Sequence, residues 1–382
     1  MILNDLRSYT DYEYVNDEPS IRRLEEYKMN EHAVVLGAGI AGLIAATVLA
    51  ERYALVTVIE RDRLPDSPIG RRGAPQGRHL HSLLSRGSQI MEELHPGFLA
   101  DLVEAGALAL DDPDMSRIYS RIGPYTFNRT DSAADPAALV TYLASRPFLE
   151  FHLRRRVEAL PNVGFLEGHD VGELVSAQPH RITGVTVSAR DSDSTETLSS
   201  DLIIDASGRA TRTPLLLERL GFPRPPEDTF TADGIYYSQQ IEIPDQDSFQ
   251  ERMILVLPEG KAQRGGLMAC ENSTWTLTIA GRTDDLTHAP TDFADMLTLA
   301  QDFIPPHIQT ALQGAQPPDR GAVIPLSRRH VAALRPPGTP PGRSACPRRR
   351  TVQPGPHQRP RHDDGYPARH HAARRTPSRQ SN

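Results

Sequence analysis

Three glycines, Gly37, Gly39 and Gly42, separate an apolar run from an alanine-rich segment, and a second apolar run then ends on Glu60. Gly37 would permit a tight strand-to-helix turn, Gly39 the approach of a pyrophosphate to the backbone, and Gly42 close packing of the helix on the strand. The helix N-terminus would offer free N–H groups and a partial positive charge to the phosphates. Glu60, at the end of the second strand, could accept hydrogen bonds from both ribose hydroxyls. Strand, glycines, helix, strand and acid in this order predict a bound adenine dinucleotide.

One alternative for this segment is a membrane span, because residues 33–50 carry no charge and are long enough to cross a bilayer. The glycines at its start, the flanking acid and the immediate second strand favour a buried parallel β–α–β unit instead. We therefore expect an α/β fold and no membrane span.

The composition is typical of a globular protein of two or three domains. The chain has 382 residues, of which 38% are hydrophobic and 24% are charged. Its two cysteines, Cys270 and Cys346, provide neither a disulfide framework nor a paired metal-ligand spacing, which fits the reducing cytoplasm. The first 28 residues lack the apolar core of a secretory signal. We expect a cytoplasmic protein without a metal site.

Further periodic segments follow along the chain. Apolar spacing predicts helices over residues 82–94 and 143–160. Short β runs are expected over residues 163–204. Alternating apolar residues between 235 and 280 predict an antiparallel sheet with one covered face. Thr291 is expected to cap a helix that follows this sheet.

Four motifs together carry a family resemblance. They are the glycine turn, the pair Glu60–Arg61, the loop P-Q-G-R-H-L-H at residues 75–81 and the segment D-A-S-G-R that begins at Asp205. With them the chain resembles the single-component FAD-dependent monooxygenases of the p-hydroxybenzoate hydroxylase type. It is most similar to the actinobacterial branch that contains the polyether (polyene) epoxidases. The likeness runs over residues 32–334, and its most particular parts are residues 60–81 and 264–281.

The resemblance implies a Rossmann-like FAD-binding domain with a parallel sheet, and a substrate domain built on an antiparallel sheet. The FAD-binding domain would span residues 30–225, with 113–140 contributing to the substrate domain at 226–325. Residues 1–29 would form a disordered extension. Residues 326–382 would hold the truncated remainder of the FAD domain and a disordered Arg/Pro-rich tail.

The resemblance also implies a set of FAD contacts. The residues concerned are Gly37, Gly39, Gly42, Glu60, Arg61, Arg78, Arg146 and Asp205. The glycines would hold the pyrophosphate and Glu60 the adenosine ribose, with Arg61 beside the adenine. Arg146, in S-R-P-F-L, would approach the pyrophosphate from its own helix, and Arg78 is a further candidate for a basic contact to the diphosphate. Asp205 matches the family's aspartate–glycine motif, although an alanine stands here in place of the glycine.

In the family that the chain resembles, the flavin carries the reaction and the protein supplies binding, orientation and exclusion of water. NADPH or NADH reduces the FAD, O2 forms a hydroperoxide at flavin C4a, and the distal oxygen passes to an electron-rich alkene or aromatic carbon. The substrate would be a small apolar or aromatic molecule that is epoxidised or hydroxylated in a dry pocket. The sheet at residues 236–280 is the expected floor of that pocket. No catalytic side chain and no nucleic-acid partner is assigned, and the oligomeric state is open.

Several conspicuous residues have more ordinary interpretations. His79 and His81 could form a catalytic or ligand pair, but one buried and one exposed loop histidine is the commoner case. Residues 154–156 are a run of arginines, which beside acids usually forms a solvated helix face. Trp275 is expected in the core. As the only tryptophan, it leaves the chain without the tryptophan-rich signature of the flavin halogenases, which share this fold. Cys270 has no evident base partner.

The last 48 residues differ from the rest of the chain. Residues 335–382 hold eleven Arg, no Lys and two Asp, with almost no aliphatic side chain, so they cannot form a core. Read one nucleotide later, residues 353–357 permit Asn-Pro-Val-His-Thr and residues 361–366 permit Gly-Met-Thr-Met-Ala-Thr, which resemble the family's second FAD motif. We therefore hypothesise a frameshift between residues 338 and 348. The alternative is a genuine disordered tail that binds acidic partners.

The sequence thus predicts an FAD- and NAD(P)H-dependent monooxygenase, impaired if the second FAD motif, which seats the flavin ring, is lost. Two alternatives remain open. One is a flavin-dependent reductase or dehydrogenase of a lipid-like substrate, and the other is a catalytically inactive flavoprotein fragment.

Overall fold

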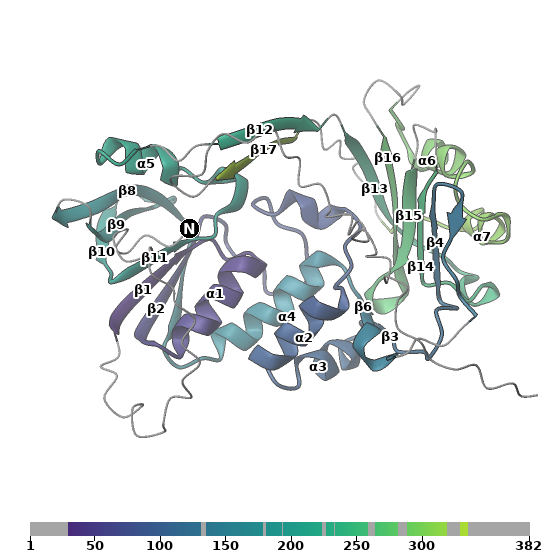
Figure 1. Cartoon of the computed structure of the whole chain (residues 1–382), viewed down its shortest axis with the longest axis horizontal. Coiled ribbons are helices and arrows are strands. Elements are labelled where there is room, and N and C mark those ends of the chain that lie inside the picture. The colour runs from purple at the N-terminus through teal and green to yellow at the C-terminus, as the bar shows by residue number, and fades with distance from the viewer. Residues whose placement is uncertain are drawn as a thin grey trace, which may run out of the picture. The chain divides into compact units, whose positions relative to one another are not determined.

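A computed structural model describes most of the chain between residues 30 and 334 (Figure 1). The described residues are 30–130, 135–178, 181–192, 194–223, 227–232, 234–258, 264–281, 289–318 and 329–334. The extension expected at residues 1–29 and the disordered, frameshifted tail expected at 335–382 lie outside the described residues.

A four-stranded parallel sheet contains the glycine turn. Its strands are β1 (Asn30–Leu36), β2 (Tyr53–Glu60), β7 (Val163–Glu167) and β11 (Leu202–Asp205), in the order β11-β1-β2-β7, and all neighbouring pairs are parallel. Helix α1 (Ile40–Ala50) joins β1 to β2, so the uncharged segment at 33–50 is a strand and a helix rather than a membrane span. No helix in the described part of the chain is long and apolar enough to cross a bilayer.

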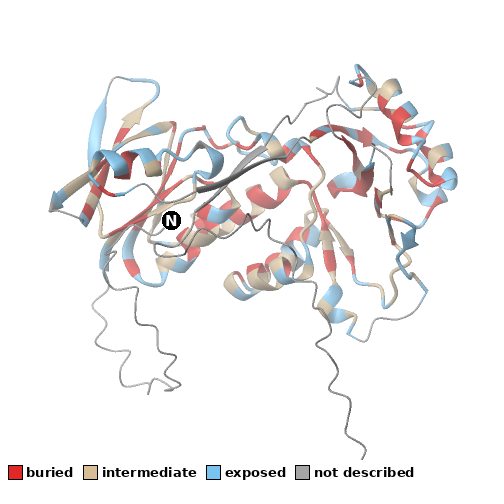
Figure 2. Cartoon of the chain, turned by 45° about the horizontal axis from the view of Figure 1, so that its top comes forward, coloured by how far each residue is buried: buried red, intermediate tan, exposed pale blue. Residues whose placement is uncertain are grey.

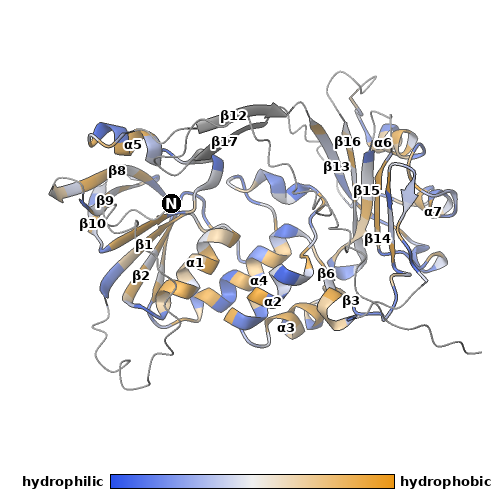
Figure 3. Cartoon of the chain, in the orientation of Figure 1, coloured by the Kyte–Doolittle hydropathy of each residue, from blue (hydrophilic) through white to orange (hydrophobic). Residues whose placement is uncertain are grey.

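Both faces of this sheet are covered, which explains why β1 is apolar without alternation. Ala33 and Val35 pack on one side, in a cluster with side chains of α1 and of α4 (Arg146–Glu158), while Val34 and Leu36 pack on the other. Helices α2 (Ser85–Leu94) and α3 (Phe98–Glu104) lie beside α4 on the first side (Figure 1). Figure 3 shows β1 and α1 as strongly hydrophobic, as this burial requires.

The second side of the parallel sheet carries a three-stranded antiparallel sheet and helix α5 (Thr213–Arg219). The strands are β8 (His169–Gln178), β9 (Arg181–Ala189) and β10 (Thr195–Ser199), in the order β10-β9-β8. Val185 of β9 shares a buried cluster with Leu216 of α5 and Ile203 of β11. The β runs predicted over residues 163–204 are therefore confirmed.

A second large sheet has six strands in the order β13-β16-β15-β14-β4-β5. Its strands are β13 (Ile235–Glu242), β14 (Met253–Leu257), β15 (Arg264–Ala269), β16 (Thr274–Gly281), β4 (Ile118–Ile122) and β5 (Tyr125–Thr126). The α/β fold with a second sheet is confirmed, but this sheet is not purely antiparallel. β4 pairs in parallel with β14, with Ser120 opposite Leu255.

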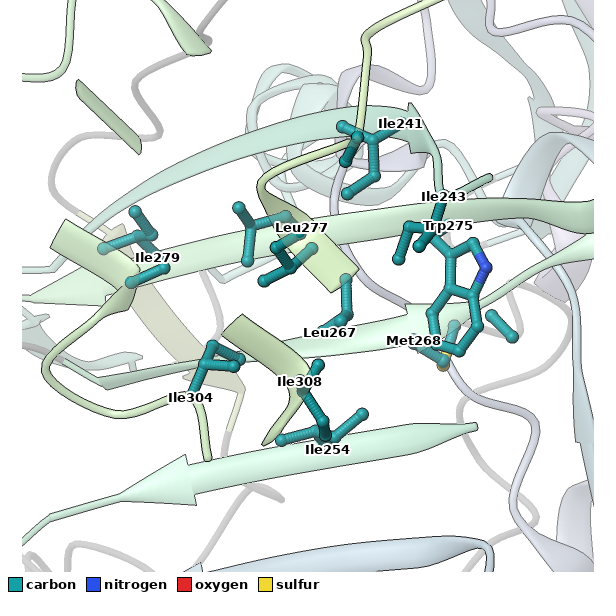
Figure 4. Packing of buried hydrophobic residues seen from close by; sticks show 14 of the residues in the cluster. Ile241, Ile243, Ile254, Leu267, Met268, Trp275, Leu277, Ile279, Ile304 and Ile308 are labelled. Atoms are coloured by element: carbon teal, nitrogen blue, oxygen red, sulfur yellow. The ribbon is translucent and has the colours of Figure 1, made fainter. Parts of the chain in front are cut away.

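Helices α6 (Phe293–Ala300) and α7 (Pro306–Leu312) cover one face of the six-stranded sheet (Figure 1). Ile304 and Ile308 meet Ile254, Leu267 and neighbouring side chains of the sheet in the largest buried cluster (Figure 4), and buried residues concentrate along this layer (Figure 2). Trp275 is fully buried in the same cluster, as predicted.

The helix cap predicted at Thr291 is wrong by one residue. Asp292 is the N-cap of α6, and its side chain accepts a hydrogen bond from the backbone N–H of Asp295 at 2.9 Å. Thr291 instead donates from its backbone N–H and its hydroxyl to Oδ2 of Asp295. The helix begins at Phe293, so the acceptor that its first amides need is the side chain directly before it.

Two further strand pairs complete the described structure. β3 (Leu108–Leu110) pairs with β6 (Thr141–Leu143), and β12 (Glu227–Ala232) pairs with β17 (Arg329–Leu334), both antiparallel. Short 3₁₀ turns occur at Pro75–Arg78, Ala137–Leu139, Gly208–Ala210, Gln246–Ser248 and Glu271–Ser273.

Candidate functional site

Two of the three glycines in the β1–α1 turn are required by packing alone. A Cβ added to Gly42 would lie 1.8 Å from the carbonyl oxygen of Gly37, so a side chain there would push α1 away from the turn. Gly37 itself has a φ of 98°, and its added Cβ would lie 3.0 Å from the carbonyl oxygen of Ala206. These two positions shape the turn without reference to any ligand.

Gly39 is different because the space beside it is open. It is the N-cap of α1, no side chain among the described residues caps this helix end, and the first turn carries no acid. Among the described residues, an added Cβ would have two neighbours within 4 Å, Nη2 of Arg146 at 3.9 Å and Nη2 of Arg71 at 4.0 Å. A helix N-terminus with an uncrowded backbone and two facing guanidinium groups is suited to a diphosphate.

Glu60 ends β2 and points its carboxylate toward the glycine turn. Oε2 accepts a hydrogen bond from the N–H of Ala38 at 2.9 Å, and Oε1 accepts one from the N–H of Asp62 at 3.1 Å. Nη1 of Arg71 lies 3.1 Å from Oε2, and Glu60 is only 5% exposed. A carboxylate has about four acceptor positions, so ribose hydroxyls would share Glu60 with these partners or displace Arg71.

Arg71 is the central cation of this site. Its Nε donates to Oε1 of Glu150 at 2.6 Å, and its Nη1 donates to Oδ2 of Asp62 at 3.2 Å in addition to its contact with Glu60. Burial alone lowers the pKa of the Arg71 guanidinium, but Glu150, Glu60 and Asp62 outweigh burial and the net pKa is raised. Arg71 therefore stays charged and anchors the loop after β2 to both β2 and α4.

Arg146 is the first residue of α4 and is less fully paired. Its Nη2 lies 3.6 Å from Oε2 of Glu150, and its Nε is buried with no hydrogen-bond partner within the described residues. Burial lowers the pKa of Arg146, Glu150 opposes that shift, and Arg71 adds to it. A desolvated cation with an unused donor gains from an anionic ligand.

A pocket open to solvent adjoins these cations, between the loop at residues 64–77 and α4. Its lining combines Arg71, Arg146 and Glu150 with the apolar side chains of Leu64, Ile69 and Phe151. Arg71 and Arg146 therefore border both this pocket and the glycine turn.

Arg61 and Arg78 lie at the surface. The side chain of Arg61 is exposed, and its backbone carbonyl accepts a hydrogen bond from Nη1 of Arg190 at 3.4 Å. Arg78 ends the 3₁₀ turn at Pro75–Arg78, also exposed, and its side chain forms no ion pair with any described residue. Neither guanidinium approaches Gly39 as closely as those of Arg71 and Arg146. Their roles in FAD binding stay predictions.

Asp205 organises its own loop. Its carboxylate accepts hydrogen bonds from the backbone N–H of Ser207 at 2.9 Å and from the hydroxyls of Ser207, Thr211 and Thr213. Burial raises the pKa of Asp205, but these hydrogen bonds outweigh burial and the net pKa is lowered. The loop that Asp205 holds includes Ala206, whose carbonyl packs against Gly37. A direct contact between Asp205 and FAD stays a prediction.

The face of the six-stranded sheet opposite α6 and α7 meets the loop at residues 75–81. One row across this sheet consists of Ser238, Thr278, Gly266, Leu255 and Ser120. The hydroxyl oxygens of Ser238 and Thr278 lie 2.7 Å apart, and Nδ1 of His79 is hydrogen-bonded to Oγ of Ser238 at 2.9 Å. Leu80 donates its N–H to Oγ1 of Thr278 at 3.3 Å, and Cδ1 of Leu80 would lie 3.2 Å from a Cβ added to Gly266. Small and hydroxyl-bearing residues therefore face the loop, while Leu277 and Ile279 alternate with them and face the helices.

The ordinary interpretations of other residues hold with two exceptions. His79 is buried as expected, but His81 is half-buried rather than exposed. The solvated face predicted at residues 154–156 is wrong for Arg154, which is 5% exposed and donates to the carbonyl of Pro65. Burial raises the pKa of the Cys270 thiol to about 12, so it is not a nucleophile.

Comparison with known proteins supports the architecture. No protein-family profile matches the chain. The protein Rv3254 of Mycobacterium tuberculosis is 37% identical over 292 residues, which cover 75% of this chain and 60% of that protein. The chain thus spans 60% of the length of this relative.

Solved structures share the fold at low sequence identity. PqsL from Pseudomonas aeruginosa, a probable FAD-dependent monooxygenase, has a TM-score of 0.55 at 13% identity, over 79% of this chain and 73% of PqsL. The p-nitrophenol 4-monooxygenase PnpA from Pseudomonas putida has a TM-score of 0.56 at 14% identity, over 80% of this chain and 70% of PnpA. The myxobacterial chondrochloren halogenase CndH has a TM-score of 0.56 at 17% identity, over 78% of this chain and 65% of CndH.

The fold is that of FAD-dependent monooxygenases and halogenases. Identities of 13–17% show the flavin monooxygenase fold alone, so the finer likeness to polyether epoxidases stays a prediction. Within this fold, sequence reasoning missed Arg71 and selected Arg78 from the same loop. The only signal for Arg71 is its place between two glycines in G-R-R-G, and a Pro/Gly-rich loop has no periodicity that says which side chain turns inward.

Proposed function

We propose that the chain binds FAD and acts as an NAD(P)H-dependent monooxygenase that epoxidises or hydroxylates a small apolar or aromatic substrate. The observation that carries the proposal is the open Gly39 backbone at the N-terminus of α1, faced by the guanidinium groups of Arg71 and Arg146. The fold shared with FAD-dependent monooxygenases supports it.

The residues present fit the adenosine diphosphate part of FAD. The diphosphate would lie against Gly39, where the backbone is uncrowded, with Nη2 of Arg146 facing it. Glu60 would accept hydrogen bonds from the ribose while keeping its contact with Ala38. Arg61 would lie beside the adenine, and Arg78 would supply a further basic contact. The turn shaped by Gly37, Gly42 and the loop of Asp205 would hold these groups in place.

The six-stranded sheet would serve as the floor of the substrate pocket. Its face toward the 75–81 loop carries hydroxyls that are already hydrogen-bonded to each other and to His79, so little unsatisfied polarity remains there. Leu255, which is 37% exposed, adds apolar surface to this face. An apolar or aromatic molecule suits such a floor. PqsL, which shares the fold, binds the small aromatic molecule 2-aminobenzoylacetate.

The division of labour follows from these two parts. When bound, FAD supplies electron exchange with NAD(P)H and the activation of O2. The chain would bind the diphosphate, fix the substrate against the sheet and exclude water from the space between them. We propose residues 30–225 as the FAD-binding domain and 226–325 as the substrate domain. Residues 113–140 contribute β4 and β5 to the second sheet, which supports assigning them to the substrate domain.

The experiment begins with purified full-length chain, incubated with FAD and freed of unbound flavin by gel filtration. We expect retained flavin, anaerobic bleaching of its colour by NADH or NADPH, and incorporation of one oxygen atom from isotopically labelled O2 into an alkene or a phenol. Mass spectrometry of the product measures that incorporation. Flavin reduction with a saturated or desaturated product and no labelled oxygen would support a reductase or dehydrogenase instead. A chain that retains no flavin at any concentration would support the inactive fragment.

A further inference from the structure

A buried contact joins the six-stranded sheet to the helix that carries Arg146. The carboxylate of Glu271 accepts two hydrogen bonds from Ser145, one from the backbone N–H to Oε2 at 2.7 Å and one from Oγ to Oε1 at 2.6 Å. Both residues are buried, at 8% and 7% exposed. They are 126 positions apart in the sequence, so the contact connects separate parts of the fold.

Ser145 is the N-cap of α4. Its hydroxyl donates to Glu271 and accepts a hydrogen bond from the N–H of Phe148 at 3.3 Å, while its carbonyl accepts one from the N–H of Leu149 at 3.1 Å. A carboxylate beside a helix N-terminus is also favoured by the helix dipole. Glu271 therefore determines where the first turn of α4 lies relative to the six-stranded sheet.

The next residue after Ser145 is Arg146, whose guanidinium faces Gly39. A displacement of the start of α4 would move Arg146 away from the position at which it meets a diphosphate. Misplacement of a binding group by about 1 Å is enough to weaken its interaction strongly. Glu271 thus acts on the diphosphate site without touching it.

The turn that carries Glu271 is held in one conformation. Asn272 and Ser273 have φ angles of 54° and 61°, a left-handed backbone that asparagine tolerates but serine adopts uncommonly. The hydroxyl of Thr274 donates to the carbonyl of Glu271 at 2.8 Å. The turn connects β15 to β16, the strands that carry Gly266 and Thr278 on the proposed substrate face.

We propose that Glu271 is a positioning residue for the cofactor site. It ties the start of α4, and with it Arg146, to the six-stranded sheet, so that the diphosphate site is complete only while the β15–β16 turn is docked on α4. The inference rests on the proposed binding of FAD at Gly39.

A double-mutant cycle tests this coupling in the full-length chain. Glu271→Gln keeps the shape of the side chain but replaces one of its two acceptor oxygens with an amide NH2, so that one of the two donors of Ser145 loses its acceptor. Arg146→Met removes the guanidinium. We expect E271Q to raise the Kd for FAD and for ADP about tenfold. We expect R146M to raise both further, and the double variant to match R146M within about twofold, because the two residues act as one unit. The proposal would be overturned if the double variant raised the Kd by the product of the two single effects, or if E271Q bound as wild type does.

Glu251→Gln is the matched control, because Glu251 is a buried carboxylate packed on the same sheet and paired with Arg129 at 2.8 Å rather than with α4. Its effect on the Kd should be the same with and without R146M. Ser145→Ala removes the hydroxyl hydrogen bond to Glu271 but keeps the backbone one. It should show a weaker form of the same coupling if E271Q folds poorly.

A chain that binds neither FAD nor ADP would refute the proposed function. The effect of Glu271 on the start of α4 can still be tested in that case, because it is measured without a ligand. Amide hydrogen exchange of Phe148 and Leu149 in the free protein reports on the first turn of α4. Faster exchange at these amides in E271Q, together with an unchanged rate in E251Q, would support Glu271 as the residue that fixes α4. Unchanged exchange in E271Q would overturn it.

Discussion

Replacing Gly39 with alanine should separate ligand binding from folding. Gly39 has φ −74° and ψ 174°, which any L-amino acid adopts. In the part of the chain that the structure describes, the added methyl would meet the guanidinium ends of Arg146 and Arg71 alone, at 3.9 and 4.0 Å. These are ordinary van der Waals distances, so the free protein has room for it. At an N-cap position the exchange of glycine for alanine should lower the free energy of unfolding by about 1 kcal/mol or less.

The same methyl would stand where a phosphate approaches the backbone. Forcing an extra methyl into a filled contact costs about 1–3 kcal/mol. At 1.4 kcal/mol per factor of ten, this raises the Kd for FAD and for ADP roughly 5- to 140-fold. The expected signature is therefore weak binding by a chain of nearly normal stability.

Calorimetric titration with ADP and FAD, together with thermal unfolding of the free protein, measures both quantities. Gly164→Ala is a suitable control, because an added Cβ at Gly164 in β7 would have no described residue within 4 Å. It should leave the affinity unchanged. A Gly39→Ala chain that binds FAD as tightly as wild type would refute the reasoning, and so would one that unfolds.

Four further outcomes follow, three from the structure and one from the sequence. The Cβ of Gly42→Ala would lie 1.8 Å from a carbonyl oxygen. This variant should lower the free energy of unfolding in urea by about 2 kcal/mol, even after the gain in helix propensity. Wild-type stability would contradict this. Arg71→Met removes the guanidinium that contacts three buried carboxylates and should lower the free energy of unfolding in urea by about 3–5 kcal/mol; wild-type stability would argue against it. Asp205 has a lowered pKa, so its ionised form should contribute about 1–2 kcal/mol to the free energy of unfolding. This contribution should be present above about pH 4 and be lost as the pH falls through the lowered pKa. Asp205→Asn should therefore unfold as wild type does in acid but be less stable at pH 7, and equal stability at both pH values would count against this. Sequencing the gene across codons 338–348 should reveal an open shifted frame, whereas stop codons there would exclude the frameshift.

The parallel sheet and its glycine turn were predictable because the signals are local. The apolar runs at residues 33–36 and 55–59, three glycines and a terminal acid all lie within 30 residues and favour the same unit. The second sheet was harder to predict. Apolar and polar residues alternate along strands β13 to β16, which predicts a sheet. The parallel pairing of β4 with β14 joins residues more than 130 positions apart, and no pattern in either strand predicts it.

The candidate site was predictable only in part, for a related reason. Glycine positions follow from the backbone, so Gly37, Gly39 and Gly42 could be selected from their spacing alone. Arginine side chains are long, and which of them turns inward depends on partners elsewhere. Arg71 is drawn in by Glu150 from α4, and Arg154 by the carbonyl of Pro65. Neither partner is near in the sequence.

The most direct test of the central claim is a titration of the purified full-length chain with FAD, followed by displacement with ADP. FAD should bind saturably at one site per chain, ADP should compete with it, and Gly39→Ala should bind both ligands more weakly. A chain that binds neither ligand, or one whose FAD is not displaced by ADP, would contradict a dinucleotide at the N-terminus of α1.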